Sequence, residues 1–188
     1  MKRFFKEFRP IVFPIFLVIV LIVGLSFVLT NIPPDDNALS VSYSSDNKFI
    51  ISNTLPMTDA VGKLISSDSN KVGTTGYLEF EVKSNINDKF KYEVYLTKDD
   101  VNNEVPTKYV KVYLTDEDDK VIFGFDKSNV LTYYDLKDAK NVNGKLLYSG
   151  TLDGKECKKF KLRMWVADTY ALTTDVNMFS VKLNVKIK

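Results

Sequence analysis

Hydrophobic and polar residues alternate along most of the chain after residue 38, the pattern of half-buried β-strands. The clearest case runs from Phe179 to Lys188, where the alternation has no exception. Turn-forming residues at 85–88, 116–120, 143–144 and 153–154 separate such stretches. The pattern predicts eight or nine strands, the others being Leu39–Tyr43, Lys48–Ser52, Leu78–Lys83, Phe90–Leu96, Val110–Leu114, Val121–Phe125, Leu146–Leu152 and Phe160–Val166.

Helical periodicity is almost absent from the same region. A single helical turn is expected at Met57–Ile65 or at Asp135–Lys140, and nowhere is a longer helical period sustained. Many short alternating strands separated by turns are typical of antiparallel sandwiches. We therefore predict an all-β domain, an antiparallel β-sandwich of jelly-roll or immunoglobulin-like type.

A continuous apolar run occupies the N-terminal part of the chain. Residues Ile11–Leu29 carry no charge, and at about 1.5 Å per residue they match a hydrocarbon core of about 30 Å. Basic residues precede the run and the first charges after it are acidic, which places the N-terminus in the cytoplasm. We expect a basic cytoplasmic flank at 1–10, a transmembrane helix at 11–30, a spacer at 31–38 and an extracytoplasmic domain at 39–188. The lipid bilayer is then the partner of residues 11–29.

A cleaved signal peptide is the alternative interpretation of this segment. Gly24 and Ser26 supply small residues near the end of the main apolar run. Apolar residues resume at Phe27, however, and no A-x-A motif is present, which favours a retained anchor. The domain is predicted outside the cell in both cases, either held at the cell membrane or secreted after cleavage.

Composition and charge exclude several classes of function. The chain has 26 basic and 24 acidic residues, a balance that does not suggest nucleic-acid binding. It contains no histidine, so Ser-His-Asp triads and HExxH zinc sites are excluded. The single cysteine, Cys157, allows no disulfide within the chain and no thiolate zinc site. We expect no enzymatic activity, no catalytic residues, no cofactor and no metal.

Four local motifs have a functional reading beside a structural one. Leu55–Thr58 resembles the start of a sortase signal, but Asp59 stands at the fifth position, which favours a loop leading to Gly62. Asp116–Asp119 could supply oxygen ligands to calcium. The run lacks the glycine and distal glutamate of an EF-hand, and Asn141–Gly144 matches that motif only in part, so solvated hairpin tips are favoured. Cys157 would have a lowered thiol pKa if the lysines at 155, 158 and 159 converge on it, although no base partner is available.

The tyrosines form a further candidate surface. All ten lie after the apolar run, and Tyr95, Tyr109 and Tyr113 alternate with core-facing residues. An exposed aromatic stripe would bind carbohydrate or a neighbouring subunit. Cross-strand aromatic pairing explains such residues as well and is the favoured interpretation.

Several of these features occur together in a known pattern. The anchor or signal is followed by Leu55–Asp59 with Gly62, and then by strand and turn motifs at 77–82, 91–96, 147–150, 160–166 and 179–188. This order resembles the exported single-domain proteins of Firmicutes that are related to camelysin and the TasA-type biofilm matrix proteins. The resemblance implies a jelly-roll-like sandwich at the cell surface, in some members polymerising into fibres by strand donation. One branch is described as a metalloprotease, for which this chain has no histidine.

These observations lead to one functional expectation with two main rivals, and a third, less favoured one is a hydrolase that would use a pair of carboxylates. We expect a membrane-anchored extracellular β-sandwich of a Gram-positive-type bacterium with a structural, adhesive or matrix role, because a retained anchor favours a tethered protein. The first rival is a secreted fibre or pilin-like subunit that donates a strand, most simply Leu39–Tyr43. The second is a glycan- or peptide-binding module of a membrane assembly. Self-association or contact with other surface proteins is expected, and no nucleic acid.

Overall fold

A computed structural model describes residues 17–20, 38–44, 47–52, 54–66, 76–102, 104–122, 130–140, 142–172 and 177–188. The chain divides into two units, Met1–Asp35 and Asp36–Lys188. In the first unit the described residues 17–20 are helical, with exposed side chains. Within the described part of the chain, no helix is long and apolar enough to cross a membrane. The rest of the predicted anchor at 11–30 and the spacer up to residue 37 lie outside the described residues.

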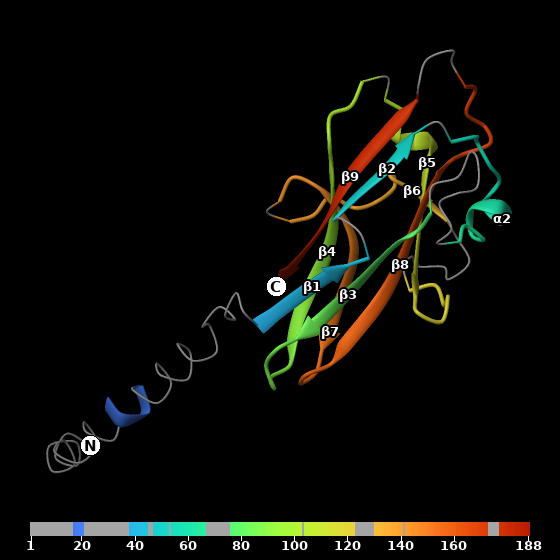
Figure 1. The fold of residues 1–188 in the computed structure, drawn as a ribbon. Helices are drawn as coiled ribbons and strands as arrows, with labels where there is room; N and C mark the ends of the chain where they lie inside the picture. Colours follow the sequence, from blue (N-terminus) through green and yellow to red (C-terminus); the bar gives the residue numbers. More distant parts are fainter. Residues whose placement is uncertain are drawn as a thin grey trace, which may run out of the picture. The chain divides into compact units, whose positions relative to one another are not determined.

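The second unit is built from two antiparallel sheets (Figure 1). Sheet A has the strand order β1-β3-β8-β5-β6, and sheet B has the order β2-β9-β4-β7. Two short helical turns, α2 (Asp59–Gly62) and η2 (Thr107–Tyr109), accompany them. The strands are β1 (Leu39–Tyr43), β2 (Lys48–Ser52), β3 (Leu78–Ser84), β4 (Phe90–Lys98), β5 (Val110–Asp116), β6 (Leu131–Thr132), β7 (Lys145–Leu152), β8 (Cys157–Val166) and β9 (Met178–Ile187).

The two sheets share one hydrophobic core. Alternate residues of each strand face inward, as in β9, where Phe179, Val181 and Leu183 are completely buried. Residues of both sheets belong to the same buried cluster, and aromatic rings link its parts, with Phe80 stacked on Phe160 at a centroid distance of 5.0 Å. The prediction of an all-β sandwich-like domain is confirmed at this level.

The predicted strands and the observed ones agree closely, with two differences. Val121 forms only an isolated bridge with Thr115, and residues 123–129, which include the end of the predicted strand 121–125, lie outside the described part. The pattern does not predict the two-residue strand β6, because two residues are too short to show a period. Of the expected helical turns, the first contains α2, while residues 135–140 form turns without a helix.

A second, smaller apolar cluster lies on the outer face of sheet A. It consists of Ile65, Tyr113 and Trp165, with Trp165 only 1% exposed. Strand alternation places Trp165 and Tyr113 on the face away from the core, but the segment 54–66, which we call the covering segment, packs over them. Gly62 of α2 touches the indole so closely that a Cβ there would lie 2.2 Å from the Trp165 ring.

Candidate functional site

Arg163 of β8 is a buried cation on the outer face of sheet A, 5% exposed. Its Nε donates to the Ile65 carbonyl at 2.9 Å, and Nη1 donates to Thr115 Oγ1 at 3.1 Å. Nη2 donates to Asp119 Oδ1 at 2.8 Å, and the guanidinium lies 5.0 Å from the centre of the Tyr77 ring. Buried charges are tolerated when their donors are satisfied in this way. Arg163 therefore joins the covering segment, strand β5 and the acidic turn to strand β8.

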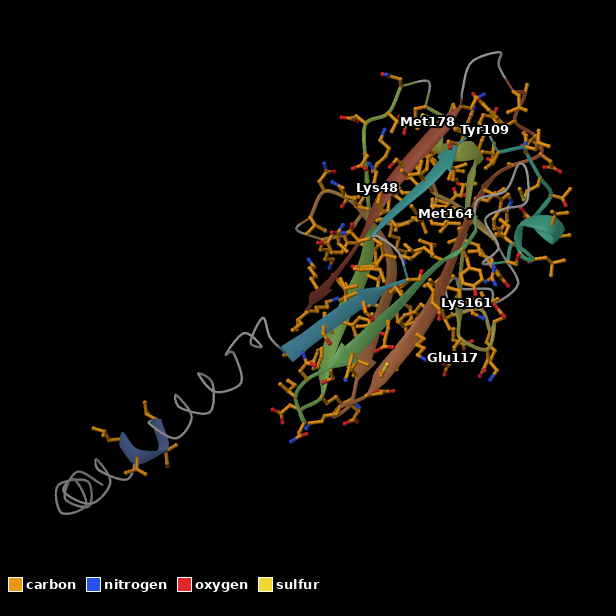
Figure 2. All side chains as sticks on the ribbon, viewed as in Figure 1. Lys48, Tyr109, Glu117, Lys161, Met164 and Met178 are labelled. Carbon is orange, nitrogen blue, oxygen red and sulfur yellow. The ribbon has the colours of Figure 1, made fainter. Side chains whose placement is uncertain are left out.

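Asp119 is the carboxylate that completes this cluster. Its backbone has a positive φ of 60°, and Oδ2 accepts a hydrogen bond from Lys161 Nζ at 3.0 Å. Partial burial works to raise the pKa of Asp119, but the hydrogen bonds from Lys161 and Arg163 outweigh it, so the net pKa is lowered. In Figure 2, Lys161 and Glu117 are labelled beside each other, and Lys161 Nζ also donates to the Glu117 carbonyl at 2.8 Å. Asp119 thus stays ionised and ties the turn to the sheet.

Two of the four carboxylates in the acidic turn at 116–119 accept hydrogen bonds from the protein. Besides Asp119, Asp116 accepts hydrogen bonds through Oδ1 from the backbone N–H groups of Asp118 and Lys120. Glu117 and Asp118 are exposed, as expected of a solvated tip, and have only long ion pairs with Lys159 and Lys120, whereas Asp119 pairs with Arg163 at 2.8 Å. Within the described ranges no three Cys, Asp or Glu side chains converge as a metal-ligand group. In the other partial calcium motif, residue 141 lies outside the described residues and Asn143 is exposed.

An open cleft of about 260 Å³ lies beside the edge strand β1. Its lining residues include three with hydroxyl groups, two with carboxylates and one with an ammonium group, together with Phe80. Ser44 Oγ already accepts the N–H of Glu79 at 3.3 Å, and Tyr43 donates to the Leu183 carbonyl. This lining can hydrogen-bond a small polar ligand. It consists of Ser42, Tyr43, Ser44, Glu79, Phe80, Glu81 and Lys159.

Cys157 is exposed at the start of β8, near this cleft. Burial of the thiol and its hydrogen bond with Glu81 raise the pKa of Cys157, and the nearby lysines at 83 and 159 only partly oppose this. The condition for a lowered thiol pKa, convergence of the neighbouring lysines on Cys157, is therefore not met. Lys158, for example, donates instead to the Thr151 carbonyl at 2.8 Å. A thiol with a raised pKa is a poor nucleophile at neutral pH.

The tyrosines do not form one exposed stripe. Tyr113 is buried under the covering segment, with its ring centre 6.4 Å from that of Trp165. Tyr109 packs on Tyr170 at 5.1 Å, and Tyr95 lies on the other sheet, 5.9 Å from the Lys186 ammonium. Aromatic pairing, the interpretation favoured by the sequence, accounts for the contacts of Tyr113 and Tyr109, whereas Tyr95 lies against a lysine. These three tyrosines therefore do not form the candidate carbohydrate-binding stripe.

The outer face of sheet B carries two ion clusters that the sequence analysis missed. Glu93 is 4% exposed, and its Oε1 lies 2.9 Å from Lys188 Nζ while Oε2 lies 3.9 Å from Lys186 Nζ. Asp99 Oδ2 lies 2.9 Å from Lys48 Nζ, and Oδ1 lies 3.8 Å from Lys182 Nζ. The hydrogen bond from Lys48 is the main cause of the lowered pKa of Asp99. The available signal was the presence of lysines at the polar positions of the last strand.

No family model matches the chain, and no curated protein matches it. The likeness to camelysin and TasA-type proteins therefore stays a prediction from sequence motifs. Functional inference rests on the chain's own residues: the apolar segment with its basic flank, the two-sheet domain, and the charged faces of the sheets.

Proposed function

We propose that the chain is a single-pass membrane protein with its N-terminus in the cytoplasm and a non-enzymatic β-sandwich outside the cell. Its role is structural or adhesive at the surface of a Gram-positive-type bacterium, as the resemblance to matrix proteins suggests. The observation that carries the proposal is the uncharged run Ile11–Leu29, with Lys2, Arg3, Lys6 and Arg9 before it and Asp35 and Asp36 after it.

Two features of the domain support a structural role. The buried cation Arg163 hydrogen-bonds to Ile65, Thr115 and Asp119, which supports a structural role for that cluster. The strand order also supports the jelly-roll subtype within the sandwich class. Successive strands lie in opposite sheets at every step except from β5 to β6, and this alternation is typical of double-sheet jelly rolls.

Protease accessibility tests this topology. Spheroplasts of the producing cell, carrying an N-terminal epitope tag on the chain, are treated with external protease. We expect the domain to be digested while the tag and its flank are protected, because the flank lies inside. Detergent lysis before proteolysis, which should expose the tag, is the control. Protection of the domain in intact spheroplasts would refute the outward orientation.

Strand donation into a fibre is the second candidate, favoured by the position of β1. Among the described strands, β1 pairs with β3 alone, over Leu39–Tyr43, and its inward residues are half-buried where those of β3 are buried. A weakly held edge strand is the element that donation requires. The mass of the mature N-terminus separates the candidates: a retained residue 1 supports the anchored protein, and a chain beginning near Ser26 supports the fibre subunit.

A ligand-binding module is the third candidate, and the cleft beside β1 is the observation that favours it. Its hydroxyl and carboxylate lining, with Glu79, Glu81 and Lys159, suits a glycan or a peptide backbone. Glu81→Gln should weaken binding of such a ligand in a glycan or peptide array. Unchanged array binding by this variant would remove the cleft from consideration.

A further inference from the structure

The outer face of sheet B has an excess of positive charge. Five lysines occupy its outward positions on β2, β4 and β9 and directly after β9, whereas Glu93 and Asp99 are the carboxylates at the outward positions along these strands. The five lysines and two carboxylates give this face an excess of three positive charges, whereas the whole chain, with 26 basic and 24 acidic residues, has a net charge of +2. The lysines are Lys48, Lys91, Lys182, Lys186 and Lys188.

Two pairs of these lysines are neighbours across strands. Lys48 and Lys182 are register partners in β2 and β9. Lys188 donates its backbone N–H to the Lys91 carbonyl at 2.9 Å, which places these two residues side by side. Like charges directly opposite one another destabilise a sheet. One carboxylate lies near each pair, Asp99 at one end and Glu93 at the other, so each pair keeps one unbalanced positive charge.

We propose that this face binds a linear polyanion that carries phosphate groups, such as an anionic polymer of the cell envelope. Lys182 and Lys188 are six residues apart along one extended stretch of chain, so the positive charges extend over roughly 20 Å in a line. An extended chain of phosphates laid along β9 would neutralise both lysine pairs. The ammonium of lysine suits phosphate as a point charge.

The composition of the face favours a soluble polymer over a lipid bilayer. Asn184 lies between Lys182 and Lys186 on β9, and Ser149 of β7 is the register partner of Glu93. Both side chains carry hydrogen-bonding groups. Ile50, at the edge strand β2, is the large hydrophobic side chain of these strands that is substantially exposed, at 42%. Binding to a bilayer surface needs a larger apolar area that inserts among the acyl chains.

The exposures of the lysines allow a matched pair of test variants. The side chain of Lys182 is 51% exposed and Lys91 is also exposed, so glutamine should be tolerated at both positions. The double variant Lys91→Gln with Lys182→Gln also keeps the lysine partners of Glu93. The control is Lys83→Gln with Lys120→Gln, which makes the same change in net charge at two exposed lysines beside strands of sheet A. Equal urea midpoints of the full-length variants establish that both fold.

Fluorescence anisotropy of end-labelled, long-chain inorganic polyphosphate measures binding to the full chain in non-ionic detergent. Each lost phosphate contact lowers the salt-dependence slope by about 0.7, so the sheet B variant should bind about 25-fold more weakly in roughly 0.1 M salt. The sheet A control should bind like the parent chain. Equal weakening in both variants, or no binding by the parent chain, would overturn the proposal.

Vesicles containing phosphatidylglycerol separate the lipid alternative. We expect the parent chain and the sheet B variant to float with these vesicles to the same extent, because the sheet B face does not contribute to vesicle binding. A difference with vesicles and none with polyphosphate would assign the face to the membrane instead. The inference goes beyond the proposed function and does not depend on it, because binding is measured on the purified chain while topology is measured in spheroplasts.

Discussion

Replacing Gly62 by alanine tests how tightly the covering segment is packed on sheet A. The added Cβ would lie 2.2 Å from Trp165 Cε2 and 2.3 Å from Cδ2. Carbon atoms in contact are about 3.5 to 4.0 Å apart, so α2 and the indole must separate by more than about 1 Å. Gly62 does not have a positive φ, so its backbone accommodates alanine and the strain comes from the side-chain contact alone.

The expected magnitude follows from two opposing effects. Overpacking of this kind destabilises a protein by about 1 to 3 kcal/mol. Loss of glycine's freedom in the unfolded chain offsets about 0.4 to 1 kcal/mol. We therefore expect Gly62→Ala to lower the free energy of unfolding by about 1 to 2 kcal/mol, a substantial part of a typical domain stability of about 5 to 15 kcal/mol.

Urea unfolding followed by tryptophan fluorescence provides the assay, because Trp165 is the chain's single tryptophan and lies under the substituted residue. Acrylamide quenching in the absence of urea reports whether the covering segment has lifted. Leu64→Ala is the control, since Leu64 belongs to the same segment but is 82% exposed, and it should change stability by less than about 0.5 kcal/mol. Neutral or stabilising behaviour of Gly62→Ala would refute the close contact.

Two further predictions concern the last strand and the acidic turn. Truncation after Asn177 removes β9, which is the partner of β2 and one partner of β4, and it uncovers the core around Phe179 and Leu183. We therefore expect the truncated chain to show no cooperative urea transition. A truncated chain that melts near the full-length temperature would contradict this and favour strand donation. Asp119 has a lowered folded-state pKa, so its ion pairs stabilise the fold above the unfolded-state pKa of about 3.9 and this stabilisation disappears as pH falls through the folded-state value. Asp119→Asn should therefore be less stable than the parent at pH 7, with the two stabilities converging below about pH 4; parallel curves throughout would count against the ion pairs.

Strand positions were predictable because each strand has one face in the core. In Phe179–Lys188, for example, the apolar residues point inward and the polar residues outward, so the period is visible in the sequence. Trp165 shows where this reasoning stops. It occupies an outward position of β8, and it is buried because the covering segment, about a hundred residues earlier in the chain, packs on it. Contacts between such distant segments leave no local period.

The charged clusters were harder to predict from the sequence for the same reason. The four acidic residues at 116–119 are conspicuous in the sequence, but nothing local indicates that Asp119 would turn back to Arg163 and Lys161. The pKa of Cys157 depends on Glu81, which is brought near by the pairing of β3 with β8. On sheet B, the residues next to Lys48 and Lys91 in the sequence do not indicate that each lysine lies beside another lysine of the C-terminal stretch 178–188.

The strand order has a consequence for when the domain can fold. β2 has its sheet partner in β9, and Ser52 pairs with Met178, more than a hundred residues later in the chain. A ribosome or a translocon delivers the chain from its N-terminus, so sheet B cannot close until β9 has emerged. With so many pairings between distant segments, folding is expected to be slow relative to helical proteins of this size. Under the proposed outward orientation, the domain would cross the membrane before sheet B has closed. Its unpaired strand edges during that interval make this the stage at which it is most vulnerable to aggregation and proteolysis.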